Sequence, residues 1–399
     1  MKFLEKQSPS RIIAAGFLAV ILLGSWILML PCSVRPGVDL QYIDALFTST
    51  SAVCVTGLIA VDVGDTFTPF GQAVVAGLIQ IGGLGVTSVG VGMILALGRK
   101  VNLKERLLVK EAMNVDTGKG MVNLVKNVLK VTLCFEVAGA VLSFICFSKR
   151  YDPLKALGVS VFHSIAAFNN SGFDNMGNFQ NLIPYKDDVL LNMTTCGLII
   201  FGGLGFLVIV DILKKRSFRK LAFHSKAVIV TTIVLLTSGT LLIQLTEDIT
   251  WMGAFFTSVS ARTAGFSTFS LGDFTNAGLL AVAVLMFMGA SPGSTGGGIK
   301  TSTVFTLFHF IKGAATNQPA GAFHYRISQE AFYKAAIVTT LSACVVAVGS
   351  FLVCIIEPHL PFIDVLFEVT SAFGTVGLST GITPNLLPTA KFVLIVIMY

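Results

Sequence analysis

One motif occurs four times along this chain, and its first copy reads Phe47-Thr-Ser-Thr-Ser-Ala-Val-Cys-Val-Thr-Gly57-Leu58. The other copies read Phe162-His-Ser-Ile-Ala-Ala-Phe-Asn-Asn-Ser-Gly172-Phe173, Phe255-Phe-Thr-Ser-Val-Ser-Ala-Arg-Thr-Ala-Gly265-Phe266 and Phe367-Glu-Val-Thr-Ser-Ala-Phe-Gly-Thr-Val-Gly377-Leu378. Each copy has Phe ten residues before its glycine, a small residue five before it, and Leu or Phe after it. The glycines are 115, 93 and 112 residues apart. A register kept through four copies indicates an internal fourfold repeat.

The sequence around each glycine predicts a short helix followed by irregular backbone. The apolar runs before the glycines, for example residues 43–52 and 251–260, are too short to cross a bilayer and are typical of re-entrant half-helices. Irregular backbone at membrane depth requires cover by protein or contact with water. Four such segments in a ring direct carbonyl oxygens and negative helix ends toward one axis, which suits a dehydrated cation. The alternative, four interfacial loops with a turn glycine, does not explain the shared register.

The composition is that of a membrane protein. Only 12% of the residues are charged and 54% are hydrophobic, with a mean hydropathy of +0.81. Soluble domains carry about 25% charged residues. These values argue against a soluble enzyme, a nucleic-acid-binding protein and a disordered chain. The seven cysteines form no CxxC pair, so neither a disulfide scaffold nor a zinc site is indicated.

Apolar segments long enough, or nearly so, to cross a membrane flank the four motifs. They comprise residues 12–30, 67–98, 131–147, 189–210, 227–246, 275–299, 335–356 and 392–399. The first is not interpreted as a cleaved signal peptide, because no small-x-small site follows it before Pro31. We therefore divide the chain into repeats at residues 1–100, 101–221, 222–325 and 326–399.

Basic residues alternate between the loops. Of 28 Lys and Arg residues, 21 lie in the N-terminus and in the loops near residues 99–130, 214–226 and 300–334. The positive-inside rule places these segments, and hence the N-terminus, in the cytoplasm. The net charge of +7 thus reports topology and does not indicate an acidic ligand.

The motifs resemble those of the Trk/Ktr/HKT superfamily of potassium transporters, over nearly the whole chain. The matching residues are Ser51-Ala-Val-Cys-Val-Thr-Gly57-Leu58, Asn169-Asn-Ser-Gly172-Phe173, Ala261-Arg-Thr-Ala-Gly265-Phe266, Thr375-Val-Gly377-Leu378, Ile81-Gly-Gly-Leu-Gly85 and Phe201-Gly-Gly-Leu-Gly205. The first span has no hairpin before it, which favours a Ktr-type membrane subunit. The resemblance implies an all-α integral membrane protein with four helix–pore-loop–helix repeats around a single central pore.

The resemblance also implies a selectivity filter whose backbone carbonyls bind K⁺ in transit. Its predicted residues are Cys54, Val55, Thr56 and Gly57; Asn169, Asn170, Ser171 and Gly172; Arg262, Thr263, Ala264 and Gly265; and Gly374, Thr375, Val376 and Gly377. Glycine at all four final positions favours potassium, whereas serine at the first is associated with sodium permeation in this superfamily.

Further expectations follow from the resemblance. The membrane subunit forms a homodimer in the bacterial cell membrane, and a cytosolic nucleotide-binding subunit of the RCK type gates it. K⁺ is the transported ion, Na⁺ is an activator in the Ktr branch, and the chain carries no cofactor of its own. The family continues its last helix into the cytoplasm, so we expect the protein to extend beyond Tyr399.

The seventh apolar segment is interrupted within residues 289–300. By resemblance this interruption is an intramembrane gating loop under the filter, with the predicted residues Ser291, Pro292, Gly293, Ser294, Thr295, Gly296, Gly297, Gly298 and Lys300. A plain kink or an unwound helix of a transporter is the alternative. A phosphate loop is not indicated, because Ile299 separates Gly298 from Lys300 and no strand precedes them.

Three smaller features complete the analysis. The two Gly-Gly-Leu-Gly runs are interpreted as helix-packing sites, since small residues let helices approach closely. Arg262 should point behind the filter, toward carbonyls or a carboxylate such as Glu368, because a cation on the axis repels the substrate. Glu136 is the one carboxylate in an outward span, and a functional role and a packing role both remain open.

We therefore expect potassium uptake and no enzymatic activity. The main alternative is a secondary transporter with broken helices at a midplane site, which should show two related halves instead of four related loops. A membrane-embedded enzyme requires a convergent set of acid, base, nucleophile or metal ligands within the spans, and the sequence contains none that is recognisable.

Overall fold

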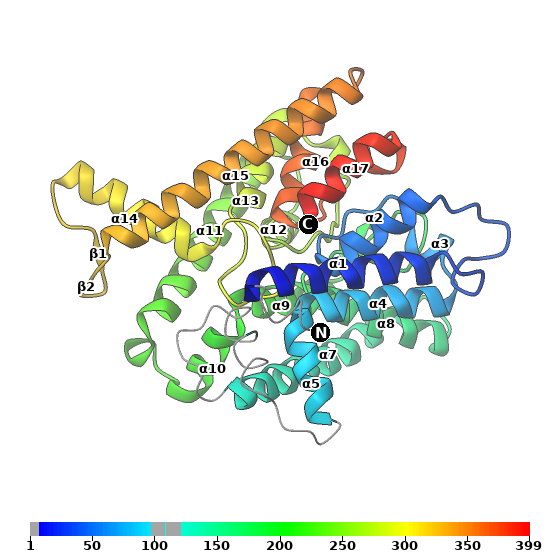
Figure 1. Ribbon diagram of the computed structural model, residues 1–399, viewed down its shortest axis with the longest axis horizontal. Coiled ribbons are helices and arrows are strands. Elements are labelled where there is room, and N and C mark those ends of the chain that lie inside the picture. The colour runs from blue at the N-terminus through cyan, green and yellow to red at the C-terminus, as the bar shows by residue number, and fades with distance from the viewer. Residues whose placement is uncertain (1–7, 97–107, 109–120) are drawn as a thin grey trace.

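The computed structural model describes residues 8–96, 108 and 121–399, and it is almost entirely helical (Figure 1). Within these residues, four helices are long and apolar enough to cross a membrane: α1 (Pro9–Leu28), α7 (Met121–Phe147), α11 (Phe223–Thr246) and α15 (Gln329–Ile356). Side chains such as Leu23, Leu133 and Leu245 are more than half exposed along them. Such surfaces are stable only against lipid, so the chain is a multi-pass membrane protein.

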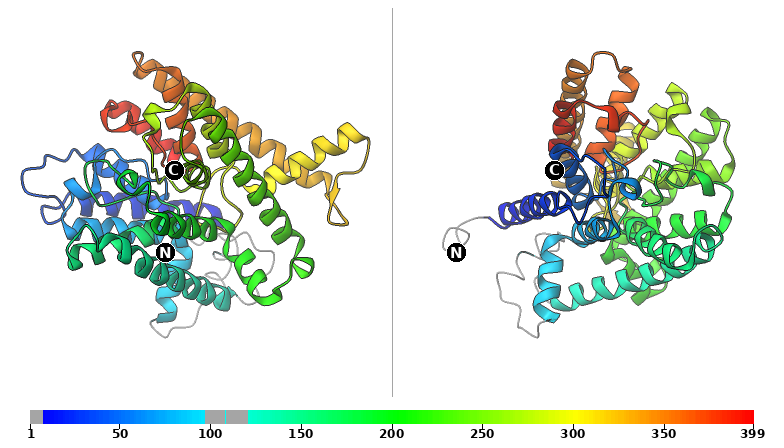
Figure 2. Two further views of the ribbon diagram at one scale, coloured as in Figure 1. Left: turned by 180° about the vertical axis from the view of Figure 1, so that it is seen from behind. Right: turned by 90° about the vertical axis from the view of Figure 1, so that its right-hand side faces the viewer.

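A short helix follows each long one and packs against it. These are α2 (Tyr42–Val53), α8 (Pro153–Phe168), α12 (Trp251–Ser260) and α16 (Phe362–Gly374). The helices predicted over residues 43–52 and 251–260 are therefore confirmed to within a residue. Most of their side chains are buried, including Phe47, Phe162, Phe256 and Phe367. Each short helix thus buries much of its surface against the longer helix before it and against other parts of the protein (Figure 2).

A third helix completes each unit. These return helices are α4 (Pro69–Leu84), α9 (Val189–Leu204), α13 (Asn276–Phe287) and α17 (Pro388–Met398). Three have side-chain N-caps, because Thr68, Asp188 and Thr275 each accept a hydrogen bond from the backbone amide three residues on. Proline begins α4 and α17, where its missing N–H costs nothing.

The first two return spans are not continuous, contrary to the expectation for residues 67–98 and 189–210. Helix α4 meets α5 (Val86–Ala96) at 102°, and α9 meets α10 (Phe206–Lys215) at 97°. The joints are Gly85 and Gly205, whose φ angles of 80° and 90° end the helices. The Gly-Gly-Leu-Gly runs therefore bend the chain as well as packing, because only glycine adopts these angles without steric cost.

The third return span is interrupted over a longer stretch. After α13 the chain is irregular until α14 (Thr301–Thr316), so the break predicted in residues 289–300 is present. Helix α14 projects to one side of the molecule and leads into a small hairpin of β1 (Gly321–Ala322) and β2 (Tyr325–Arg326) (Figure 1). The other short elements are α3 (Val63–Thr66) and the 3₁₀ turns at Ile183–Tyr185, Phe218–Lys220, Leu271–Asp273 and Thr383–Asn385.

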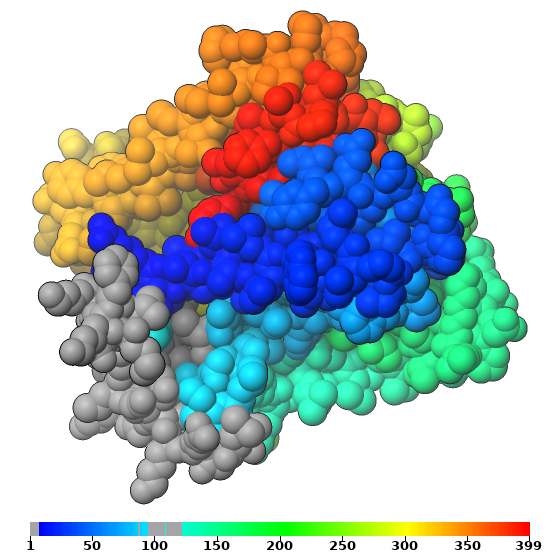
Figure 3. Space-filling view, turned by 45° about the vertical axis from the view of Figure 1, so that its right-hand side comes forward, coloured from blue at the N-terminus to red at the C-terminus, as the bar shows by residue number. Residues whose placement is uncertain are grey.

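The last unit packs against the first. Helix α17 contacts α2, so the C-terminal residues lie beside the N-terminal ones (Figure 3). Lys391 of α17 forms a buried ion pair with Asp44 of α2 at 2.7 Å. The units are therefore arranged in a closed circle and not in a row.

The predicted sidedness and repeat boundaries stay predictions. Basic residues do lie at the start of outward helices, for example Lys126 and Lys130 in α7 and Lys226 in α11. The boundary at residue 221 falls between Phe218–Lys220 and α11, and that at residue 325 falls in the hairpin. The boundary at residue 100 and several predicted cytoplasmic residues lie outside the described residues: Lys2, Lys6, Arg99, Lys100, Lys104, Arg106, Lys110 and Lys119.

Candidate functional site

Irregular backbone around the repeated glycine follows each short helix. We call these stretches, residues 54–58, 169–173, 262–266 and 374–378, the four glycine segments. Each has two residues with positive φ, namely the glycine itself and the residue two positions before it. The pairs are Val55 and Gly57 (58° and 86°), Asn170 and Gly172 (58° and 67°), Thr263 and Gly265 (71° and 76°), and Thr375 and Gly377 (48° and 93°). The fourfold repeat therefore extends to backbone conformation.

The glycine segments touch one another in a ring. A Cβ atom at Gly57 would lie 2.0 Å from the carbonyl oxygen of Ser171, and one at Gly172 would lie 2.7 Å from that of Ala264. In the same way, a Cβ atom at Gly265 would lie 2.4 Å from the carbonyl oxygen of Val376, and one at Gly377 would lie 2.3 Å from that of Thr56. Each glycine thus faces the carbonyl of the next repeat, and the fourth faces the first. A side chain at any of these positions collides with the neighbouring backbone.

Serines on the short helices hold three of the segments. The Ser51 hydroxyl accepts a hydrogen bond from the Gly57 amide at 3.0 Å and donates one to Leu58 O at 2.7 Å. Ser371 accepts from the Gly377 amide at 3.0 Å, and Ser260 donates to Phe266 O at 2.5 Å. These serines escaped the sequence analysis, although Ser51 and Ser371 occupy the same place, six residues before the glycine.

The second segment is held differently. Ala166 stands where the first and fourth repeats have Ser51 and Ser371, so no hydroxyl is present there. Instead Asn181, in the loop after the segment, donates to Gly172 O at 3.2 Å and accepts from the amides of Leu182 and Ser267. One amide side chain therefore joins the outer ends of the second and third segments.

Arg262 points away from the ring, as expected, but not toward the predicted carboxylate. Its side chain is 7% exposed and its Nη2 lies 3.5 Å from the carbonyl oxygen of Gly289. Glu368 instead accepts hydrogen bonds from the Ser379 hydroxyl, the Thr380 amide and the Thr383 hydroxyl. The pairing of Arg262 with Glu368 is therefore wrong, because the post-segment loop already occupies both carboxylate oxygens.

The loop between α13 and α14 lies against the start of the third and fourth segments. Cβ atoms at Gly296 and Gly297 would lie 2.0 and 2.2 Å from the side-chain oxygens of Thr263 and Thr375. These threonines are at the ends of the segments nearest the short helices. The loop thus contacts the ring on the side where the short helices end.

The same loop is hydrogen-bonded to the bend in the second return helix. The Ser291 amide donates to Gly203 O at 3.1 Å, and the Phe206 amide donates to Gly293 O at 3.0 Å. The Gly-Gly-Leu-Gly run at residues 202–205 is therefore part of the surface against which the loop packs. Lys300, which was predicted as part of the gating loop, donates a hydrogen bond from its Nζ to Gly296 O at 2.6 Å, so its side chain closes the loop on itself.

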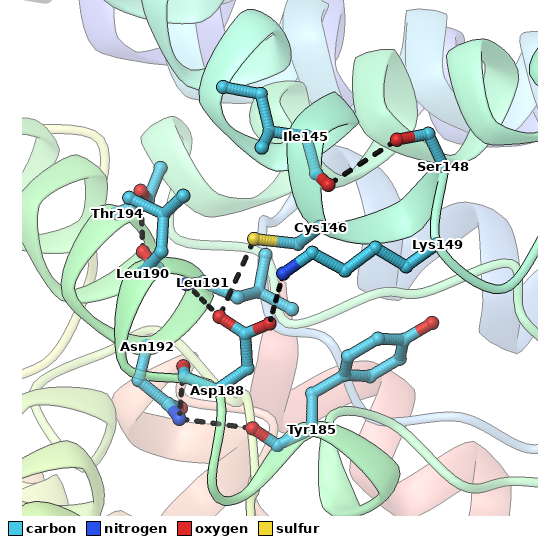
Figure 4. A network of polar contacts seen from close by, with 10 residues as sticks. All are labelled: Ile145, Cys146, Ser148, Lys149, Tyr185, Asp188, Leu190, Leu191, Asn192 and Thr194. Carbon is cyan, nitrogen blue, oxygen red and sulfur yellow. Dashed lines mark hydrogen bonds and ion pairs between the residues drawn. The ribbon is translucent and has the colours of Figure 1, made fainter.

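Carboxylates at the other end of the helices fasten the return helices. Figure 4 shows Asp188 accepting from the Leu191 amide at 3.0 Å and contacting Cys146 and Lys149 of the outward helix. Burial raises the pKa of Asp188, but the Leu191 amide, the Cys146 thiol and Lys149 outweigh burial, so the pKa falls below its usual 3.8. At the starts of the other two return helices, Glu247 accepts a hydrogen bond from the Thr275 amide before α13, and Glu357 accepts one from the Leu387 amide before α17.

The sequence analysis did not assign these three carboxylates a role in fastening the return helices. Glu247 and Glu357 follow directly on their outward helices, at the positions of the helix C-caps. That shared position is the signal by which the sequence analysis would have found two of them. In the part of the chain that the structure describes, no three His, Cys, Asp or Glu side chains gather to hold a metal ion.

Comparison with known proteins agrees with this architecture. The model of the TrkH family, described as a cation transport protein, matches residues 4–250 and 227–399. Ktr system potassium uptake protein B of Bacillus subtilis is 37% identical, with 98% of this chain and 90% of that protein covered. Potassium/sodium uptake protein NtpJ of Enterococcus hirae is also 37% identical, with 99% and 90% covered.

A solved structure shares the fold. The crystal structure of the potassium transporter TrkH from Vibrio parahaemolyticus superposes with a TM-score of 0.74, covering 99% of this chain and 82% of that one. The identity is 18%, so this likeness concerns the arrangement of helices alone.

Proposed function

Because this chain belongs to the TrkH family of cation transport proteins, and is a transporter and not an enzyme, we propose that it takes up potassium ions through the ring of glycine segments. The relatives at 37% identity are named as potassium and potassium/sodium uptake proteins. In this proposal K⁺ is the cargo and moves inward down the membrane potential, which is worth about 2.3 kcal/mol per charge per 100 mV.

The single observation that carries the proposal is the closed ring of alternating backbone. In each segment a residue with positive φ is followed by one without and then by the glycine with positive φ, as in Val55, Thr56 and Gly57. Such alternation turns successive carbonyls to the same side of the strand. A ring of carbonyls replaces the hydration shell of K⁺. The alternation covers twelve of the sixteen residues predicted for the filter, and the remaining four, Cys54, Asn169, Arg262 and Gly374, lie where the short helices end.

The helix ends support the same proposal. Helices α2, α8, α12 and α16 all end where a glycine segment begins. The C-terminal end of a helix carries a partial negative charge of about half an electron. Four such ends at one ring favour a cation there without any carboxylate. Arg262, the one cationic side chain in the predicted filter, turns its guanidinium away toward Gly289 O.

We further propose that the loop at residues 289–300 gates the pathway. Its support is the contact of Gly296 and Gly297 with Thr263 and Thr375, directly across one end of the ring. An RCK-type cytosolic subunit and Na⁺ activation complete this proposal, as do a homodimer and a cytoplasmic N-terminus in the cell membrane. Their support is the likeness to proteins named as parts of a Ktr system and to a potassium/sodium uptake protein.

Broken helices also occur in secondary transporters with a midplane site. Here the breaks occur after α4, α9 and α13, in three successive repeats. They therefore follow the fourfold repeat and not a division into two halves. This observation favours a pore over a two-halved transporter.

The proposal is tested by growth of a bacterium without its own potassium uptake on limiting K⁺, with a cytosolic regulatory subunit co-expressed. The chain should restore growth and K⁺ accumulation. Gly57→Ser should lower the preference for K⁺ over Na⁺, because the added atoms meet Ser171 O. Gly37→Ser is the matched control, since Gly37 has a φ of 87° and nothing within 4 Å of a Cβ.

A failure to restore K⁺ accumulation, with the protein present in the membrane, contradicts potassium uptake. Restored uptake with the same ion preference in Gly57→Ser and Gly37→Ser contradicts the filter alone. The two parts of the proposal are thereby tested separately.

A further inference from the structure

Glu136 contacts the second glycine segment from behind. Its Oε1 accepts a hydrogen bond from Nδ2 of Asn169 at 3.1 Å. The same Nδ2 donates to Oε1 of Gln80 at 2.9 Å and to Ile165 O at 2.9 Å. Glu136 is in α7, Gln80 in α4 and Asn169 at the end of α8, so three helices from two repeats meet at one amide.

The environment of Glu136 argues against a packing role. The neighbouring Leu133 and Val137 on α7 are 63% and 55% exposed and face outward, whereas Glu136 is partly buried and turned toward α8. A carboxylate within a membrane span is costly unless it finds partners. Leucine in this place would pack as well and avoid that cost. The carboxylate has polar side-chain partners in Gln80 and Asn169, and Asn169 belongs to the proposed ion pathway.

Asn169 is the residue through which such a contact can act on the pathway. It is fully buried, caps the C-terminus of α8 and stands three residues before Gly172. The next residue, Asn170, already has a φ of 58°. The orientation of Asn169 therefore sets the direction in which the backbone leaves the helix. Because Gly172 packs on Ala264 O, a shift here is passed to the third segment.

The corresponding position in the third repeat is Arg262, which is fixed by another means, a contact with Gly289 O. Cys54 and Gly374 occupy it in the first and fourth repeats, and neither carries an amide or a charged group. The second segment also has Ala166 where Ser51 and Ser371 fasten theirs. Glu136 and Gln80 thus act on the repeat that lacks the serine.

We propose that Glu136 is a positioning residue for ion selection: together with Gln80 it holds the Asn169 amide and keeps the second glycine segment in the geometry that prefers K⁺. The proposal rests on the proposed function of the ring. Glu136 does not touch the ion, and its effect passes through Asn169.

The test compares three variants in cells without their own potassium uptake, measuring the KM for K⁺, the maximal rate and inhibition by Na⁺. Glu136→Leu removes the acceptor and should reduce the K⁺ over Na⁺ preference about tenfold, the worth of a hydrogen bond to a charged group. Glu136→Gln keeps an acceptor oxygen and should retain the wild-type preference. Val137→Leu, one residue along on the exposed face, is the matched control and should also retain it.

A double variant shows whether the effect passes through Asn169. Glu136→Leu combined with Asn169→Leu should have the same ion preference as Asn169→Leu alone. Additive losses mean that Glu136 acts independently, and they overturn the proposal. So does an unchanged preference in Glu136→Leu, or an equal loss in Glu136→Gln.

Two further results separate possible failures. If Glu136→Leu does not accumulate in the membrane, Gln80→Leu replaces it, because it removes the second acceptor of the same amide without a change of charge. It should also lower the preference, and a wild-type preference then overturns the proposal. Absence of K⁺ uptake in the unmodified chain contradicts the proposed function itself, whereas uptake with unaltered selection in the variants contradicts only the role of Glu136.

Discussion

Gly377, in the fourth glycine segment, packs against the carbonyl oxygen of Thr56 in the first. A Cβ atom there would lie 2.3 Å from that oxygen, closer than real Cβ contacts. Of the four contacts around the ring, this one joins the first repeat to the last, and its two residues are 321 positions apart in sequence. It makes the difference between four segments in a row and a closed ring.

The first prediction concerns this closure. Gly377→Ala should lower the preference for K⁺ over Na⁺, because the methyl group forces the first and fourth segments apart. The ratio of K⁺ to Na⁺ uptake in a deficient strain measures the effect. Gly381→Ala is the matched control: its φ is 96°, close to the 93° of Gly377, but nothing lies within 4 Å of a Cβ. Both variants carry the backbone strain of alanine at positive φ, about 1–2 kcal/mol, so equal ion preferences would contradict the role of the contact.

The second prediction concerns the ion pair between Asp44 and Lys391. Both side chains are largely buried, at 13% and 8% exposure. Asp44→Ala should destabilise the protein by about 3–5 kcal/mol, because it leaves a buried ammonium without a partner. Thermal unfolding of the detergent-purified protein measures this. Glu330→Ala is the control, since both side chains of its pair with Lys334 are 75% exposed and water screens their attraction, so its loss should change stability little.

A double variant distinguishes the ion pair from simple packing. Asp44→Leu with Lys391→Met replaces both charges by apolar groups and should recover much of the stability lost in Asp44→Ala. A double variant as unstable as Asp44→Ala would mean that the cost comes from lost packing at α2.

The third prediction concerns the bend at Gly205. A Cβ here would lie 2.7 Å from Pro292 O, and the next amide donates to Gly293 O. Gly205→Ala should therefore displace the proposed gating loop and reduce the dependence of K⁺ uptake on the cytosolic regulatory subunit. Gly85→Ala is the matched control, because Gly85 has a φ of 80° and nothing within 4 Å. Uptake is compared with and without the regulatory subunit, and an equal response in both variants would argue against the loop contact.

The fourth prediction concerns Asp188 as a helix cap. Asp188→Ala should cost about 0.5–2 kcal/mol at neutral pH, since the Leu191 amide loses its acceptor. The pKa of Asp188 is lowered from 3.8 in the folded protein, so its contribution is fully present above that value and is lost as the pH falls below it.

Unfolding of wild type and Asp188→Ala is therefore compared at neutral pH and below pH 3.8, and the difference should shrink on acidification. Asp187→Ala, at an exposed neighbouring position, is the control and should change little at either pH. A difference that is independent of pH would mean that Asp188 stabilises α9 by packing and not as an ionised cap.

The short helices were predictable because their signal is local. The apolar run before Gly265 ends at Ser260 in both the prediction and the structure. The bends at Gly85 and Gly205 were not predicted, because an uncharged run of glycine and apolar residues is compatible with both a straight span and a broken one. Close helix packing and a backbone turn with positive φ both require glycine, and the spacing of the glycines in the Gly-Gly-Leu-Gly runs does not distinguish the two.

Side-chain partners depended even more on the fold. That Arg262 turns away from the axis follows from charge alone, but charge left its partner open between carbonyls and Glu368, and the structure shows the carbonyl of Gly289. The Ser379 and Thr383 hydroxyls lie close in sequence to Glu368 and reach it first, since a short loop closes at less entropic cost than a contact across the ring. Asn169, Gln80 and Glu136 come from separate helices, and no spacing in the sequence relates them.

By itself the sequence determined the membrane setting, the four repeats and the glycines at their centre, because hydrophobicity and backbone freedom are properties of single residues and their spacing. Only the tertiary structure decided that Gly377 meets Thr56, that the loop at residues 289–300 rests on Thr263 and Thr375, and that Glu136 reaches Asn169. These contacts join residues far apart along the chain. They exist because closing the ring brings all four segments to one axis, where each backbone packs against the next.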